Sequence, residues 1–222
     1  MLLALDTSTR TMGLALYDGV RVLSENVWTS QDYHTVELAP AVEEMLKKSD
    51  VGISDLEALG VAIGPGSFTG LRIGLALAKG LALVRHIPLI GIPSLDVLAA
   101  AQAQTNIPMA ASLRAGRGWL AVGWYKLAED SWQSSGNLEV LTAQDLSKRI
   151  HSPTLVCGEF TERERRLLKR KRKNVILASP AQSLRRPAFL AELAWERWQA
   201  GDTADPATLS PIYLHHGEPI PG

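Results

Sequence analysis

The first hundred residues alternate between short apolar runs and longer segments with helical periodicity. Three apolar runs at the start are separated by the turn TSTRT and by an Asp-Gly turn, a pattern that predicts an antiparallel meander. From Thr35 to Lys48 the apolar residues recur at helical spacing, which places Leu38, Val42 and Met45 on one face. Two later runs, ALGVAIG and IPLIGI, predict buried strands, each followed by a helix, and the first of these helices runs from about Thr69 to Val84.

The strand–turn–strand pattern of the N-terminus recurs after about residue 105. MAASL, the glycine-bearing turn RAGRG and WLAVGWYKLA again predict strand, turn and strand. Farther on, TLVCGE predicts a short strand and PAFLAELAWERWQA an amphipathic helix, and the proline-rich tail is expected to lie over the surface. A chain that opens twice in this way predicts two α/β lobes, residues 1–104 and 105–222, of which the second is the more divergent.

Composition narrows the class of protein. Basic and acidic residues both number 23, so the chain as a whole has no electrostatic attraction to nucleic acid or anionic lipid. The single cysteine, Cys157, excludes an internal disulfide, fits a reducing compartment and is expected to pack as a small buried hydrophobe. Arg72 and Lys79 interrupt the best apolar stretch, and the N-terminus lacks the basic start and cleavage site of a signal peptide. We therefore expect a soluble cytoplasmic protein.

Asp6 ends the first apolar run and is followed by hydroxyl side chains in a tight turn. A carboxylate and hydroxyls in this arrangement could hold magnesium and phosphate oxygens. Alternatively, Asp6, Thr7 and Ser8 form hydrogen bonds with their own backbone, as is common in turns. The short motif by itself favours this second interpretation.

The stretch GPGSFTG raises the question of a phosphate-binding loop. No lysine follows its last glycine as in a P-loop, and the glycine spacing does not match G-x-G-x-x-G. The spacing also excludes the nucleophile elbow of a serine hydrolase, although weak anion binding at the start of the next helix is left open. We predict a turn with a structural role, formed by Gly64, Pro65, Gly66, Ser67 and Thr69.

Small residues recur every four positions along the helix after this turn, at Gly70, Gly74 and Ala78. Glycine in mid-helix costs about 1 kcal/mol relative to alanine, so another backbone is expected to approach Gly74 closely. That backbone could belong to the protein's own sheet or to a partner. Both assignments stay open on the residues alone, although a bulkier apolar face is available for the sheet: Ile73, Leu77 and Leu81.

Several of these motifs together resemble one family. LALDTST, HTVELAP and GPGSFTGLRIGLALAKGLA with PLIGIPSL are similar to TsaB (YeaZ) proteins, the bacterial partners of TsaD in making threonylcarbamoyladenosine on transfer RNA. The resemblance covers about the first hundred residues and is faint beyond them, chiefly at SPIYL. It implies the actin/Hsp70-like (ASKHA) fold, an α/β fold of two lobes that each open with a strand–turn–strand meander and are flanked by helices.

The resemblance also implies a role. In this family the helices that correspond to residues 35–48 and 69–84 pair with their counterparts in TsaD, or in a second TsaB, as a four-helix interface. A non-catalytic scaffold that activates TsaD for threonylcarbamoyl transfer to adenosine 37 is therefore expected, with a TsaE-like ATPase as a further partner and a homodimer when the chain is alone. Transfer RNA would be reached only through the complex, and no membrane is involved. The expected interface residues are Leu38, Val42, Met45, Gly70, Gly74 and Ala78.

The chemistry of active relatives is incomplete in this sequence. ATPases of the superfamily need a carboxylate in the first hairpin of each lobe, but the second hairpin, ASLRAGRGWLAV, has none and carries Arg114 instead. Ser8 stands where the phosphate turn would have glycine, and the second histidine of a TsaD-type metal pair, four residues after His34, is replaced by Leu38. We expect no metal and no cofactor, with weak ATP or ADP binding near the partner interface left open. The alternative is an active ATP-dependent transferase or a metalloprotease-like enzyme that uses Asp6 and an interlobe cleft.

A basic run from Arg163 to Lys173 holds eight of the 23 basic residues. It could be a solvated helix face whose cations pair in part with Glu162 and Glu164 at helical spacing. It could also contact the phosphate backbone of transfer RNA. No aromatic residues are interleaved for base stacking, and the solvated face is slightly preferred.

Overall fold

The computed structural model describes residues 1–31, 34–116, 118–171 and 173–214. The chain forms two compact units, and each is described by itself. The first contains Met1–Val97 and Arg185–Ile212, and the second contains Leu98–Leu184 together with Tyr213 and Leu214. Among the described helices, none is long and apolar enough to span a bilayer.

The first unit is built on a five-stranded sheet in the order β3-β2-β1-β4-β5. Its first three strands run antiparallel and form the predicted meander, whereas β4 and β5 are parallel to β1. The strands are β1 (Leu2–Asp6), β2 (Thr11–Tyr17), β3 (Val22–Thr29), β4 (Ala58–Gly64) and β5 (Leu89–Pro93).

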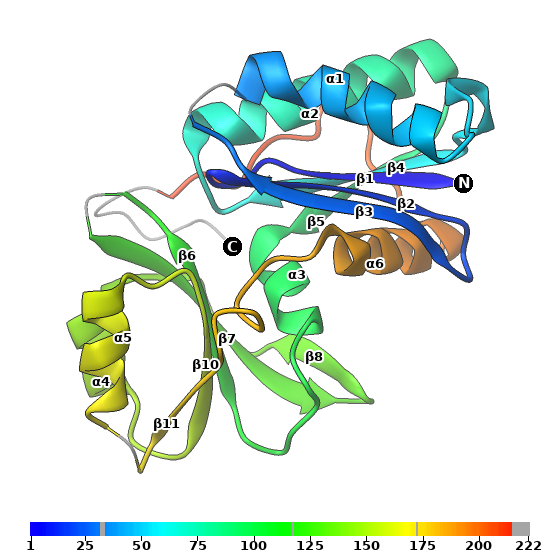
Figure 1. Ribbon diagram of the computed structural model, residues 1–222. Helices are drawn as coiled ribbons and strands as arrows, with labels where there is room; N and C mark the ends of the chain where they lie inside the picture. Colours follow the sequence, from blue (N-terminus) through cyan, green and yellow to red (C-terminus); the bar gives the residue numbers. More distant parts are fainter. Residues whose placement is uncertain (32–33, 117, 172, 215–222) are drawn as a thin grey trace. The chain divides into compact units, whose positions relative to one another are not determined.

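Helices cover both faces of this sheet (Figure 1). The helices α1 (His34–Lys48) and α2 (Phe68–Arg85) lie on one face, close to the bounds predicted from the sequence. The helix α6 (Pro187–Gln199) packs on the other face, where Leu190, Ala191 and Ala194 join the core. A short 3-10 helix, η1 (Ile53–Asp55), precedes β4, and α3 (Ser94–Ala100) follows β5.

The C-terminal part of the chain returns to the first unit, which differs from the expected division between residues 104 and 105. Besides α6, the segment after it lies along this unit, since Ala204 N–H donates to Leu89 O at 2.8 Å and Ile212 N–H to Ile63 O at 2.7 Å. The reason is that one face of the first sheet is apolar and is covered by α6. A periodicity argument finds α6 but does not say which sheet it covers.

The second unit repeats this topology. Its sheet has the order β11-β10-β6-β7-β8, in which β6–β7 and β7–β8 are antiparallel and β10 is parallel to β6 and β11. Read from β8 to β11, order and direction match the first sheet from β3 to β5, which agrees with two lobes of one plan. The strands are β6 (Met109–Arg114), β7 (Trp119–Ala128), β8 (Ser131–Ser134), β9 (Glu139–Thr142), β10 (Thr154–Gly158) and β11 (Val175–Leu177).

Two helices of the second unit, α4 (Ala143–Arg149) and α5 (Glu162–Lys169), share a core with this sheet. Leu146 of α4 and Leu168 of α5 are fully buried in it. The buried Cys157 lies in β10, and burial raises the pKa of its thiol, which therefore stays protonated. Its predicted role as a packed hydrophobe is confirmed.

Candidate functional site

The turn after β1 is buried and closed by an arginine from the far end of the sequence. One carboxylate oxygen of Asp6 accepts the Ser8 N–H at 2.8 Å, and the other accepts Arg185 Nε–H at 2.8 Å. The same guanidinium donates to Thr9 Oγ1 and to Thr11 O, both at 2.9 Å. The side chains of Arg185 and Asp6 are 1% and 3% exposed, so this is a buried ion pair.

These residues do not fit a magnesium–phosphate site. Both oxygens of Asp6 already have partners, and the positive charge that a metal ion would bring is supplied by Arg185. A metal ion at Asp6 would leave the buried guanidinium without its counter-ion, which is costly. The predicted bonding of the turn to its own backbone holds for Asp6 alone, which accepts the Ser8 N–H, whereas the hydroxyls of Thr7 and Ser8 bond Gly70 and Ser94. Arg185 was missed from the sequence because 179 positions separate it from Asp6.

The glycine-rich turn is packed against the Asp6 turn. Ser67 N–H donates to Ser8 O at 2.6 Å, and a side chain at Gly66 would collide with that same carbonyl. Ser67 caps α2 through its hydroxyl, which accepts Gly70 N–H at 3.3 Å. Gly64 has a φ of +103° and donates its N–H to Ser94 Oγ at 3.1 Å. The N–H groups of Gly64, Ser67 and Gly70 are thus used for hydrogen bonds within the protein.

Ser94 and two other residues complete this turn. The hydroxyls of Ser8 and Ser94 lie 2.5 Å apart in a buried hydrogen bond. Pro65 follows Gly64 through a cis peptide bond and is buried, whereas Thr69 is exposed on the first turn of α2. These contacts agree with the structural role predicted for Gly64, Pro65, Gly66 and Ser67, and leave Thr69 without a packing role.

The stripe of small residues on α2 faces its own lobe, which corrects its assignment to a partner interface. Thr7 Oγ1 donates to Gly70 O at 2.7 Å, so the turn after β1 lies directly against the helix. A side chain at Gly70 would collide with the Thr7 carbonyl, and one at Gly74 with the Thr7 hydroxyl. Ala78 is fully buried in the same core. The group that approaches Gly74 is the side chain of Thr7, and the backbone of Thr7 approaches Gly70, so both close contacts lie within the protein itself.

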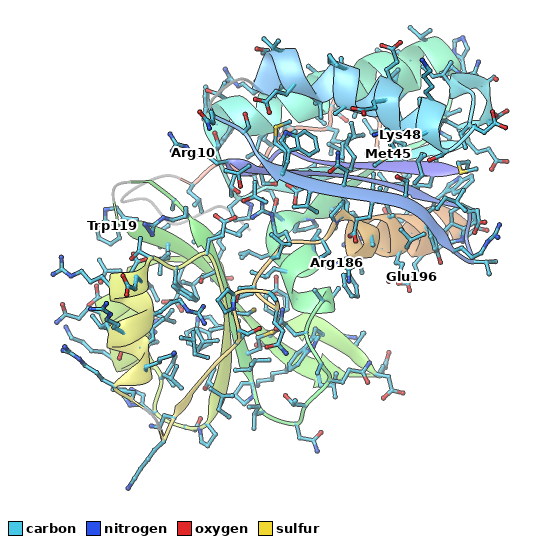
Figure 2. The ribbon with its side chains drawn as sticks, viewed as in Figure 1. Arg10, Met45, Lys48, Trp119, Arg186 and Glu196 are labelled. Atoms are coloured by element: carbon cyan, nitrogen blue, oxygen red, sulfur yellow. The ribbon has the colours of Figure 1, made fainter. Side chains whose placement is uncertain are left out.

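The residues expected to form the interface on α1 are also part of the core. Leu38, Val42 and Met45 are buried in the cluster that joins α1 and α2 to the sheet. Figure 2 shows Met45 on the side of α1 that faces the sheet. Their assignment to a partner interface was wrong because an apolar helix face first covers its own sheet.

A different face of these helices is exposed and carries apolar side chains together with Arg72. On α2, Phe68, Leu83 and Val84 are 54%, 60% and 78% exposed, and on α1, Val36 is 68% exposed. Gly80 lies in α2 one turn before Leu83 and Val84, and an added Cβ there would meet no atom within 4 Å. Nothing in the described part of the molecule therefore requires glycine at this position. We call this face the α1/α2 outer face: Val36, Ala39, Pro40, Phe68, Arg72, Ala76, Gly80, Leu83 and Val84, in which the Arg72 guanidinium lies over the Phe68 ring at 3.7 Å.

The second unit also has an ion pair at the end of its first strand, but there the strand ends in the arginine and the carboxylate comes from a helix. Arg114, at the end of β6, donates to both carboxylate oxygens of Glu164 at 2.9 and 3.0 Å. Glu164 also accepts the N–H of Thr161 at 2.7 Å in a capping box at the start of α5. Among the described residues, no group of three or more His, Cys, Asp or Glu side chains could hold a metal ion. The side chain of His34 lies outside the described residues.

Comparisons with known proteins agree with this architecture. Residues 21–174 match the family model described as TsaD, tRNA N6-adenosine threonylcarbamoyltransferase. The tRNA threonylcarbamoyladenosine biosynthesis protein TsaB of Bacillus subtilis is 31% identical over 98% of this chain and 95% of its own length. The solved structure of YeaZ from Pseudomonas aeruginosa has a TM-score of 0.79 and 26% identity, covering 96% of this chain and 99% of that one.

A more distant structure shows likeness of fold alone. The ROK hexokinase from Thermus thermophilus has a TM-score of 0.51 and 12% identity, with 90% of this chain and 99% of that chain covered. Together with the repeated strand order, these likenesses confirm the expected actin-like fold.

Proposed function

Because the chain belongs to the TsaB (YeaZ) family of tRNA threonylcarbamoyladenosine biosynthesis proteins, we propose that it is the non-catalytic subunit that binds and activates a TsaD-like protein. In this proposal the TsaD-like partner transfers the threonylcarbamoyl group to adenosine 37 of transfer RNA, and a TsaE-like ATPase joins the complex. The chain itself contributes a binding surface that holds the partner in its active arrangement.

The observation that carries the non-catalytic role is the Asp6–Arg185 ion pair. An ASKHA ATPase needs a carboxylate free to hold the metal–phosphate group, and in this chain that carboxylate is buried and neutralised. The hairpin of the second unit has Arg114 where a second carboxylate would be needed, and that arginine is paired with Glu164. A turn built in this way supports packing rather than phosphoryl chemistry.

The docking surface in this proposal is the α1/α2 outer face. On α2, Ala76, Leu83 and Val84 are exposed within about one turn of Gly80, a glycine that no contact within the described chain explains. A glycine in an exposed helix costs about 1 kcal/mol relative to alanine, and close packing of a partner helix is a physical reason to retain it. We place the TsaD-like protein there, and self-association through the same face is expected when the partner is missing.

Reconstitution tests the proposed function. The full chain and the TsaD-like protein of the same organism are expected to co-elute on size exclusion. Threonylcarbamoyladenosine formed on a tRNA transcript, measured by nucleoside mass spectrometry, should rise about tenfold or more over the TsaD-like protein alone. The chain alone should form none. Product formation by the isolated chain, or co-elution without any gain in product, would contradict the proposal.

We also predict that the isolated chain has no magnesium-dependent nucleotide site. Calorimetric titration with ATP and magnesium should give no saturable heat in the micromolar range, because both carboxylate oxygens of Asp6 already accept hydrogen bonds, one of them from Arg185. Saturable binding that depends on magnesium would refute this expectation. Binding seen only with the TsaD-like protein present would instead assign the nucleotide to the partner interface.

A further inference from the structure

The outer face of α5 carries a strip of arginines. Arg163, Arg166 and Arg170 are exposed, lie three and four residues apart, and line an open groove together with Glu162 and Leu167. Figure 2 shows side chains that end in nitrogen atoms, drawn in blue, extending outward around the helices of the second unit. We call these three residues the arginine strip.

The strip has fewer acidic partners than its sequence indicates. Glu162 pairs with Arg166 one turn away, as expected for a solvated helix face. Glu164, the second acid of the run, is instead committed to Arg114 and to the capping box. Among the described residues, no ion pair involves Arg163 or Arg170. The groove therefore carries an uncompensated positive charge although the whole chain is neutral.

The chemistry of the strip indicates what it binds. Guanidinium groups present forked donors that match phosphate oxygens. The apolar side of α5 is turned inward, with Leu168 fully buried and Leu167 half-buried, so the helix has no large apolar side chain to insert into a bilayer. No aromatic residue lies between the arginines to stack on bases. Phosphates on a rigid backbone, contacted without base recognition, fit these features.

We propose that the arginine strip binds the phosphate backbone of structured RNA. The identity of that RNA as transfer RNA rests on the proposed function, whereas the phosphate contact rests on the strip alone. This assignment departs from the solvated-face interpretation because the structure gives Glu164 a different partner. In the complex, the strip adds electrostatic affinity and leaves the choice of nucleotide to the partner.

The test is fluorescence anisotropy of a fluorescein-labelled tRNA transcript at several potassium chloride concentrations. The full chain is measured alone and with the TsaD-like protein, as wild type and as Arg163→Gln/Arg170→Gln. The control variant, Arg21→Gln/Lys126→Gln, removes two exposed cations elsewhere in the chain. The strip variant should bind about 10-fold more weakly. The slope of its log affinity against log salt is negative and should become shallower, its magnitude decreasing by about 1.4–1.8. The control variant should change neither value.

Two results would overturn the inference. One is an affinity and a salt slope that stay at wild-type values in the strip variant. The other is strip-dependent binding to phosphatidylserine vesicles with tRNA binding unchanged, which would assign the strip to a lipid surface. Loss of co-elution with the TsaD-like protein in the wild type would contradict the proposed function, and the anisotropy of the chain alone would still decide on the strip.

Discussion

Replacing Arg185 by methionine is expected to lower the free energy of unfolding by about 3–5 kcal/mol, because the buried carboxylate of Asp6 loses its counter-ion. The hydroxyl of Thr9 and the carbonyl of Thr11 lose a donor at the same time. For a chain of this size the loss corresponds to a fall in melting temperature of roughly 6–20 °C. Thermal and urea unfolding measure it directly.

The neighbouring arginine provides a matched control. Arg186 forms an ion pair with Glu25, but its side chain is 51% exposed, so Arg186→Met should cost no more than about 1 kcal/mol. Adding Asp6→Asn to Arg185→Met removes the stranded charge and should recover roughly 1–3 kcal/mol. Equal effects of the two arginine variants, or no recovery in the double variant, would show that the ion pair does not stabilise the fold.

Two glycines of α2 are expected to respond to leucine in opposite ways. Gly74→Leu should destabilise the isolated chain, since the new side chain collides with Thr7 in the packed turn. Overpacking of this kind costs about 1–3 kcal/mol, or roughly 2–12 °C in melting temperature. Gly80→Leu should leave the chain folded and slightly more stable, because its surroundings are open and leucine has the higher helix propensity.

Partner binding separates the same two variants. Gly80→Leu is expected to weaken co-elution with the TsaD-like protein by about 5- to 150-fold, since a bulky side chain would hold two packed helices apart. Gly80→Ala serves as the smaller step and should raise the unfolding free energy by up to about 1 kcal/mol. Normal binding by a folded Gly80→Leu chain would exclude the α1/α2 outer face as the docking surface. A Gly74→Leu chain that is stable but does not bind would restore the original assignment of the buried stripe.

Local patterns in the sequence were sufficient for the elements of the first unit. Strand alternation, the Asp-Gly turn and the helical spacing of Leu38, Val42 and Met45 act between residues close in the chain, so they can be read without the fold. The restart at MAASL indicated the second lobe for the same reason, and the structure repeats the strand order there. The packing role of the glycine-rich turn also followed from spacing, since the phosphate templates did not match.

Only the tertiary structure decided which helix face is buried and which residue completes the Asp6 turn. Periodicity shows that α2 has one face of small residues and one of bulky residues, but burial depends on how Thr7, in the turn after β1, approaches the helix. Arg185 meets Asp6 only because α6 returns to the first sheet, a long-range contact that no local pattern encodes. The ion pair of Glu164 with Arg114 is likewise a long-range contact, because the fold brings together charges that lie 50 positions apart.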